Sequence, residues 1–249
     1  MNNLNYSTYT MKKKFLTVLA FLAVFNYAEA QNHLIESVEN PVDFVNPLMG
    51  TDSSPGLSNG NTYPAVAVPW GMNLWTPQTG PMGHGWAYTY DADKIRGFKQ
   101  THQPSPWMND YGQFSLMPVT RGMKFNQDDR ASWFSHKAEV STPYYYKVYL
   151  ADHDVTVELT PTERAAQFKI SFPKSDSSYV VIDPFDKGSY VKVIPEENKI
   201  IGYTTKYARG KLTNFKNYFV IQFDKPFSDV NTWEGDQLAK GQAEMKADH

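Results

Sequence analysis

Short runs in which apolar and polar residues alternate occupy most of the chain between residues 113 and 223. The run VTVELT at 155–160 places its apolar residues on one side of an extended strand and its polar residues on the other. AQFKISF at 166–172 repeats this pattern. Further strands are predicted at 144–150, 179–183, 190–194, 199–206 and 217–223. Because antiparallel sheets with one solvated face have this alternation, the predicted fold class is all-β, an antiparallel β-sandwich.

Residues 46–112 differ in composition from this strand-rich part. They hold nine of the fifteen Gly, eight of the sixteen Pro and four of the six Trp, so no long helix is expected there. Disordered segments are poor in aromatic residues, and this one is rich in them. We therefore expect ordered loops and short strands.

The two ends of the chain carry separate signals. Lysines at 12–14, an apolar run at 15–25 and Ala-Glu-Ala at 28–30 predict a secretory signal peptide over residues 1–30. The apolar run is shorter than the roughly 20 residues that span a bilayer, and no cysteine is present to carry a lipid anchor. We expect the mature domain, residues 31–249, to be periplasmic or secreted, with no membrane contact after cleavage. The alternation that resumes at 237–249 stops without a turn, which predicts a sandwich incomplete at its C-terminal end.

Composition removes several classes of function. The chain has no cysteine, which excludes disulfides, thiolate metal sites and a cysteine nucleophile. A formal net charge of −2 argues against a nucleic-acid partner. GLSNG at 56–60 matches the G-x-S-x-G pattern of serine hydrolases but lacks the strand before it and the helix after it. The six histidines do not have the close spacing of a transition-metal site.

Carboxylates allow two readings. Asp91 and Asp93 could begin a hard-cation site, although turn formation explains most loop aspartates. Glu158 and Glu163 could form a glycosidase pair, but Glu158 alternates with threonines on a polar strand face, which favours solvation.

The aromatic loops give the strongest signal from the residues alone. Sugars stack their C–H faces on Trp or Tyr while Asp, Asn and His bind their hydroxyls. Residues 86–110 contain this mixture, and only seven charged residues fall in 46–112, which fits a neutral polyol ligand. The alternative is that the tryptophans belong to the sandwich core, which composition alone favours.

Seven motifs, in order along the chain, resemble the opening of glycoside hydrolase family 92, the exo-acting α-mannosidases. None is diagnostic alone, but together they cover nearly all of the mature chain. The motifs are VNPLMGTD at 45–52, NTYPAVAVPWGM at 61–72, GWAY at 85–88, IRGFKQTH at 95–102, DYGQFSLMP at 110–118, ELTPTER at 158–164 and YFV at 218–220.

The resemblance implies an N-terminal, supersandwich-like β-sandwich that packs on a C-terminal (α/α)6-barrel domain, with the active site between them. Hydrolysis is inverting: one carboxylic acid protonates the leaving oxygen, and a second carboxylate, about 6.5–9.5 Å from it, activates water. Ca2+ holds the sugar hydroxyls. Since the family's carboxylates and calcium ligands lie in the barrel, no catalytic and no metal-binding residue is assigned in this chain.

The resemblance also implies that three loops supply the sandwich's share of the sugar pocket. Their substrate-binding residues are Gly50, Thr51, Asp52, Trp86, His102, Trp107, Asn109 and Asp110. Many members have Ser-His-Thr-His and a glycine-rich loop where this chain has KQTHQPSPW at 99–107, so the resemblance does not fix the linkage preference.

The sequence thus predicts the N-terminal domain of an inverting exo-α-mannosidase, of the α-1,2 type, that removes mannose from glycans, including N-glycans. Its expected partners are a mannose-containing glycan and the barrel domain, without which it is inactive. Two alternatives remain: a non-catalytic carbohydrate-binding sandwich, and a structural or adhesive surface sandwich.

Overall fold

The protein is built from antiparallel sheets, as seen in a computed structural model that describes residues 40–52, 62–81, 88–101, 114–184, 188–205 and 214–248. The chain divides into two units, Met1–Val45 and Asn46–His249. The described part of the first unit contains the 3-10 helix η1 (Pro41–Phe44). All strands found among the described residues belong to the second unit. The predicted signal peptide lies outside the described residues.

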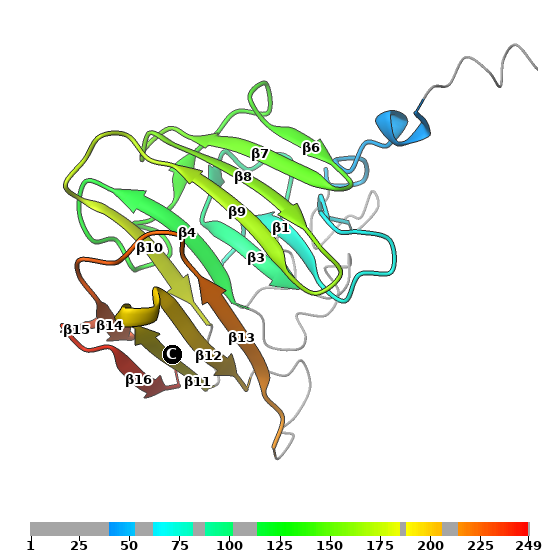
Figure 1. Ribbon diagram of the computed structural model, residues 1–249. Helices are drawn as coiled ribbons and strands as arrows, with labels where there is room; N and C mark the ends of the chain where they lie inside the picture. The colour runs from blue at the N-terminus through cyan, green and yellow to red at the C-terminus, as the bar shows by residue number, and fades with distance from the viewer. Residues whose placement is uncertain are drawn as a thin grey trace, which may run out of the picture. The chain divides into compact units, whose positions relative to one another are not determined.

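Three four-stranded sheets form most of the second unit (Figure 1). One has the order β1-β3-β4-β10, with β1 (Leu74–Gln78), β3 (Gly97–Thr101), β4 (Ser115–Thr120) and β10 (Ser178–Asp183). The next has the order β6-β7-β8-β9, with β6 (Val140–Thr142), β7 (Tyr145–Leu150), β8 (Val155–Pro161) and β9 (Ala166–Ser171). The third has the order β13-β12-β11-β16, with β11 (Ser189–Ile194), β12 (Lys199–Thr204), β13 (Asn217–Gln222) and β16 (Glu244–Ala247).

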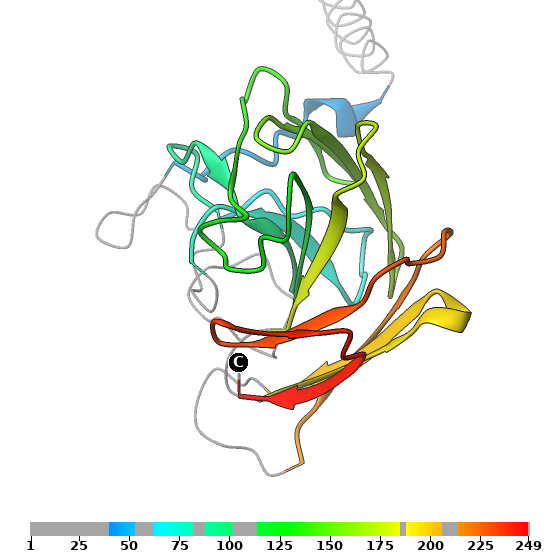
Figure 2. The ribbon, with the colours of Figure 1, turned by 90° about the vertical axis from the view of Figure 1, so that its left-hand side faces the viewer.

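Two small pairs complete the described strands. They are β2 (Lys94–Ile95) with β5 (Ser132–Trp133), and β14 (Asn231–Glu234) with β15 (Gln237–Lys240). The 3-10 helix η2 (Pro195–Glu197) joins β11 to β12. Figure 2 shows the last strands of the chain, in orange and red, gathered with β11 and β12 into a layer of their own. The described residues include no helix with the length and apolar character needed to cross a bilayer.

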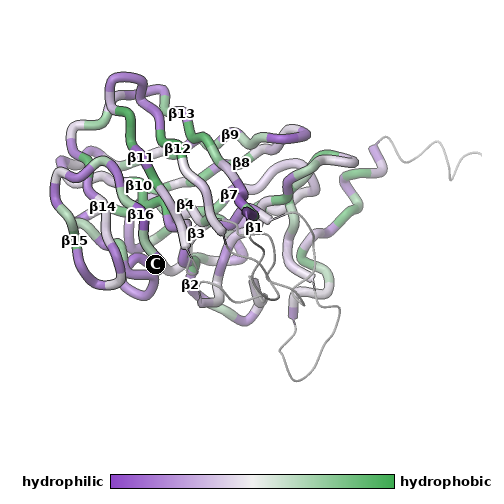
Figure 3. Tube along the Cα trace, turned by 90° about the horizontal axis from the view of Figure 1, so that it is seen from below, coloured by the Kyte–Doolittle hydropathy of each residue, from purple (hydrophilic) through white to green (hydrophobic). Residues whose placement is uncertain are grey.

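The predicted alternation is confirmed where a strand has one face in the core. Along β8, Val155, Val157 and Leu159 are at most 1% exposed, while the residues between them point outward. All seven strands predicted between residues 144 and 223 are present, with ends shifted by up to two residues. Figure 3 shows hydrophobic colour along β13 and hydrophilic colour at many of the turns. Residues 88–90, in the part of the chain where ordered loops and short strands are expected, run without regular structure into a turn, because their main chain bonds to loops.

The sheet β1-β3-β4-β10 is buried more deeply than the pattern predicted. All six residues of β4 are buried, whereas a half-solvated strand buries every second one. One face packs on β6–β9, where the ring of Phe98 lies edge-to-face with those of Tyr146 and Phe168, with centroids 6.2 and 6.1 Å apart. Phe114, next to β4, stacks on Phe219 of β13 at 4.5 Å. The three large sheets therefore share one hydrophobic core.

Arg130, Asp183 and His153 form a connected set of polar contacts inside this core. Arg130 is fully buried, and its guanidinium lies 2.8 Å from the Asp183 carboxylate of β10. The carbonyl of Arg130 accepts a hydrogen bond from Nε2 of His153 at 2.8 Å. Nδ1 of His153 in turn accepts from the amide of Thr120, the last residue of β4. This chain of contacts joins β4, the β7–β8 turn and β10.

These contacts make acid stability depend on His153. Burial lowers the pKa of His153, because its imidazole is fully enclosed and one nitrogen serves as an acceptor. Protons then bind the unfolded chain more readily than the folded one, so the free energy of unfolding should fall as the pH drops below about 6.5. We expect His153→Gln, whose amide can both accept and donate, to flatten this dependence in urea unfolding measured from pH 8 to pH 5. If the free energy of unfolding falls equally with pH in the original chain and in His153→Gln, His153 is not the group responsible.

Candidate functional site

The first predicted sugar loop is a tight turn made by residues 46–52. The side chain of Asn46 accepts from the amide of Leu48 at 3.0 Å, a local bond that asparagine favours at turns. Gly50 has φ 82°, a left-handed conformation that glycine adopts without strain. The hydroxyl of Thr51 donates to the carbonyl of Leu48 at 2.7 Å. The motif NPLMGT therefore encodes a fixed backbone shape.

Three contacts anchor this turn to the sandwich. The amide of Tyr90 donates to the carbonyl of Thr51 at 3.0 Å. The hydroxyl of Thr62 donates to the carbonyl of Met49 at 3.0 Å. Leu48 packs against a small apolar cluster centred on two buried tyrosines, Tyr63 and Tyr88.

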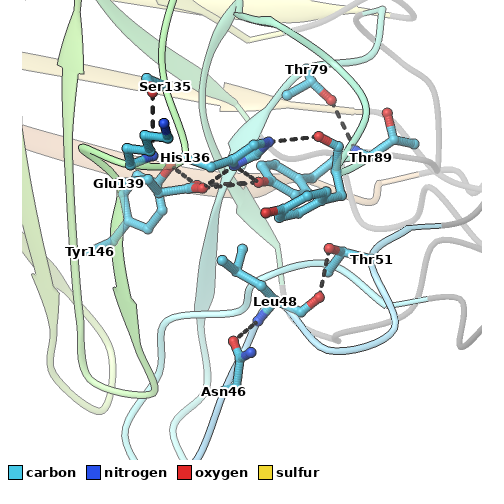
Figure 4. A network of polar contacts seen from close by, with 12 residues as sticks. Asn46, Leu48, Thr51, Thr79, Thr89, Ser135, His136, Glu139 and Tyr146 are labelled. Carbon is cyan, nitrogen blue, oxygen red and sulfur yellow. Dashed lines mark hydrogen bonds and ion pairs between the residues drawn. The ribbon is translucent and has the colours of Figure 1, made fainter.

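A buried carboxylate, Glu139, organises the residues behind the turn (Figure 4). Its side chain has no exposed surface. It accepts hydrogen bonds from the hydroxyl of Tyr146 at 2.5 Å and from that of Tyr88 at 3.2 Å. Nδ1 of His136 lies 2.7 Å from its second oxygen. Three polar partners thus compensate for burying the charge.

The two tyrosines are held in their protonated form. Burial, together with the nearby charge of Glu139, raises the pKa of Tyr88 and of Tyr146 well above the ordinary value. Their hydroxyls therefore stay hydrogen-bond donors to Glu139 at physiological pH. This cluster orients and fixes its neighbours, and it offers no activated nucleophile.

The main-chain segments that flank the three predicted sugar loops converge on this cluster. Thr51 belongs to the first of these loops, Tyr88 directly follows residues 82–87, and Thr101 directly precedes residues 102–113. Tyr63 packs with Tyr88, and its hydroxyl donates to the hydroxyl of Thr101 at 3.4 Å. The loops therefore start or end on one shared scaffold.

The substrate-binding residues predicted from sequence divide into two groups. Gly50, Thr51 and Asp52 are described: Thr51 is fully buried with its hydroxyl engaged in the turn, and Asp52 is exposed. The rest of the set lies outside the described residues, and its role stays a prediction. These residues are Trp86, His102, Trp107, Asn109 and Asp110.

Sequence reasoning missed His136, Glu139 and Tyr90. The available signal was a His and a Glu three residues apart in SHKAE at 135–139, directly before a short strand. Such a pair reads as a surface turn, because Tyr88, which helps to bury it, lies 51 residues away in the sequence.

Of the other candidate carboxylates, Asp91 and Asp93 lie in connecting segments, and Glu158 has side-chain partners. The carbonyl of Asp93 accepts from the amide of Phe134, and Asp91 lies in a turn. Glu158 accepts from the hydroxyl of Tyr145 at 2.7 Å and pairs with Lys169 at 2.9 Å, and these bonds lower its pKa on the solvated face of β8. Among the described residues, no three acidic or histidine side chains gather as a metal site would require. We therefore assign no calcium ligand to them.

Comparison with known proteins places this scaffold in a recognised context. The model of the glycosyl hydrolase family 92 N-terminal domain matches residues 44–249. The family GH92 inverting mannosidase BT2199 from Bacteroides thetaiotaomicron VPI-5482 is 48% identical, with a TM-score of 0.79, over 83% of this chain and 28% of that one. The family GH92 α-mannosidase BT3965 from Bacteroides thetaiotaomicron is 26% identical, with a TM-score of 0.64, over 82% of this chain and 30% of that one. No match was found among curated proteins.

A further solved structure supports the fold alone. The GH92 family glycosyl hydrolase ccman5 is 22% identical, with a TM-score of 0.64, over 83% of this chain and 29% of that one. The chain thus spans less than a third of the length of these relatives.

The weight of Glu139 in the scaffold can be measured on strand β7. Tyr146→Phe leaves a buried carboxylate with one donor fewer, so we expect the free energy of unfolding in urea to fall by about 1–3 kcal/mol. Tyr149→Phe is the matched control, because Tyr149 is 42% exposed and donates to Asp154 at 2.8 Å. Tyr149→Phe should lower the free energy of unfolding by less than about 0.5 kcal/mol. Equal losses in the two variants would contradict the role given to Glu139.

Proposed function

Because the chain belongs to glycosyl hydrolase family 92 through its N-terminal domain, we propose that it forms part of an exported, inverting exo-α-mannosidase. In this proposal its loops bind mannose-containing glycans at a site completed by an (α/α)6-barrel domain. The enzyme is of the α-1,2 type and acts on glycans that include N-glycans. The lysines at 12–14 and the apolar run at 15–25 support export, to the periplasm or the medium.

The observation that carries the proposal is the convergence of three family motifs on one scaffold. The Tyr63–Tyr88 cluster packs against Leu48 of the first loop predicted to bind sugar, contains Tyr88 beside the second, and bonds to Thr101 beside the third. Thr51 of the first loop accepts from the amide of Tyr90. Binding loops mounted on a rigid sandwich keep their geometry, which a sugar site requires. The low charge of residues 46–112 supports a neutral ligand.

Chemistry in this proposal is divided between the two domains. The sandwich binds and orients the sugar, and the barrel supplies the acid, the base and Ca2+. Inversion requires two carboxyl groups far enough apart to admit a water molecule, about 6.5–9.5 Å. No described carboxylate is assigned to either role. When bound, Ca2+ would hold sugar hydroxyls through oxygen ligands.

An exposed tryptophan supports a partner surface on the sandwich. Trp70 is 99% exposed and has φ 61°, at the third position of a turn closed by the bond from the Gly71 amide to the Val68 carbonyl. A turn with proline second and a positive φ third favours glycine at that third position. The turn is also fixed from outside, because the amide of Met72 donates to the carbonyl of Glu163 at 2.6 Å. A strained, rigid and fully exposed indole is suited to anchoring another domain.

Mannose release from α-1,2-mannobiose tests the function. We expect no release by this chain, and calcium-dependent, EDTA-sensitive release by the product of the reading frame continued past His249. Inversion should appear as β-mannose in the first NMR spectra taken after mixing.

The other outcomes are equally informative. Release by the short chain would refute the assignment of the carboxylates to a second domain. Inactivity of both products, with mannobiose still bound, would favour a non-catalytic carbohydrate-binding sandwich.

The role of Trp70 predicts opposite effects in two contexts. Trp70→Gly should raise the free energy of unfolding of this chain by about 0.5–1 kcal/mol, because glycine relieves the backbone strain and no packing is lost. In the protein that includes the barrel, the same change should lower the stability, because the anchor is removed. Urea unfolding measures both.

Arg121→Gly is the matched control, since Arg121 is also exposed and has φ 60°. It should raise the stability equally in both contexts. If Trp70→Gly behaves like this control, Trp70 is no anchor.

A further inference from the structure

His136 sits in a turn that is shaped by its own sequence. The amide of Ala138 donates to the carbonyl of Ser135 at 2.9 Å, and the hydroxyl of Ser135 accepts from the amide of Lys137 at 3.3 Å. This turn brings His136 beside Glu139, three residues later. The side chain of His136 is 26% exposed, so it lies at the margin of the buried cluster.

Both ring nitrogens of His136 face acceptors. Nδ1 lies 2.7 Å from the Glu139 carboxylate, and Nε2 lies 2.7 Å from the carbonyl of Tyr90. The imidazole also stacks on the ring of Tyr90, with centroids 3.9 Å apart and an angle of 5° between the ring planes. The ring of Phe134 is nearly perpendicular to the imidazole, with centroids 5.0 Å apart. The stacking of the His136 ring and the hydrogen bond of its Nε2 together hold Tyr90 in place.

Tyr90 passes this restraint to the first sugar loop. Its carbonyl accepts from His136, and its amide donates to the carbonyl of Thr51 at 3.0 Å. The preceding residue is fixed separately, since the amide of Thr89 donates to the hydroxyl of Thr79 at 3.0 Å. The side chain of His136 thus bonds directly to the Tyr90 main chain.

We propose that His136 is a positioning residue, which ties the main chain of Tyr90 to the buried Glu139 carboxylate and thereby sets the position of residues 48–52 beside the sugar. The mechanical part of this inference rests on the hydrogen bonds alone. Its consequence for sugar turnover rests on the proposed function.

Two substitutions separate the hydrogen bonds from the stacking. His136→Phe keeps an aromatic ring for Tyr90 but removes both ring nitrogens and with them the contacts to Glu139 and to the Tyr90 carbonyl. His136→Gln removes the ring but keeps an amide nitrogen with two N–H groups, enough to donate to Glu139 and to Tyr90. If hydrogen bonding positions the loop, glutamine rescues it and phenylalanine does not.

Amide hydrogen exchange of this chain, read by NMR, is the direct test. In His136→Phe we expect the Tyr90 amide to exchange at least about tenfold faster, because its bond to Thr51 opens more often. In His136→Gln and in the control Tyr149→Phe, exchange should stay within about twofold of the original chain. Unchanged exchange in His136→Phe would overturn the proposal.

A second variant covers a folding failure. Should the circular dichroism of His136→Phe show loss of structure, His136→Asn replaces it, because its amide is one methylene shorter than that of glutamine and cannot reach both acceptors. Faster Tyr90 exchange in the asparagine than in the glutamine variant supports the proposal, and equal exchange refutes it.

Kinetics of the longer product on α-1,2-mannobiose test the consequence for the sugar. We expect kcat/KM to fall about tenfold in His136→Phe and to recover in His136→Gln. Faster exchange with unchanged kcat/KM would show that His136 positions a loop that does not serve the sugar. If the longer product releases no mannose at all, the proposed function fails while the exchange result still decides the role of His136.

Discussion

Burial of the sheet β1-β3-β4-β10 on both faces is the constraint from which the other features follow. A sheet covered on both sides has no water to satisfy its polar groups, so each needs a partner inside the protein. The ion pair of Arg130 with Asp183 and the bonds of His153 meet this requirement at one end of β4. The same rule applies outside this sheet to the buried Glu139, whose partners are two tyrosines and His136. The sandwich thus contains polar joints whose geometry is much more specific than that of apolar contacts.

Such joints explain how loops of irregular sequence hold a defined shape. The turn at 46–52 contains little apolar surface of its own, and Met49 is 76% exposed. Its order comes from the packing of Leu48 and from hydrogen bonds to Thr62 and Tyr90. Tyr90 is itself tied through His136 to the buried Glu139. Rigidity is thus passed outward from the core to the loop through main-chain atoms of Tyr90 and Thr51.

The sequence predicts strands well where one face meets water, as β7 and β8 demonstrate with their regular alternation. It does not reveal β4, because a strand buried on both faces has no period of two. In the candidate site, local chemistry predicts the turn around Gly50. The partnership of Glu139 with Tyr88 and Tyr146 was not predictable, because it joins residues that pattern rules treat separately. The sequence shows Trp70 only as part of a motif, and it is the exposure of its side chain in the structure that reveals a bare indole.

The pairing of β11 with β16 has a consequence for how the chain folds. Residues 189–192 bond to residues 244–247, so a long stretch of chain must be closed into a loop before this contact is gained. During synthesis β11 leaves the ribosome well before β16. In the interval β11 is paired with β12 on one side, and its other edge is free. Until the late strand arrives, that edge can pair with a strand from another molecule, so nascent chains are most prone to misassembly at this point.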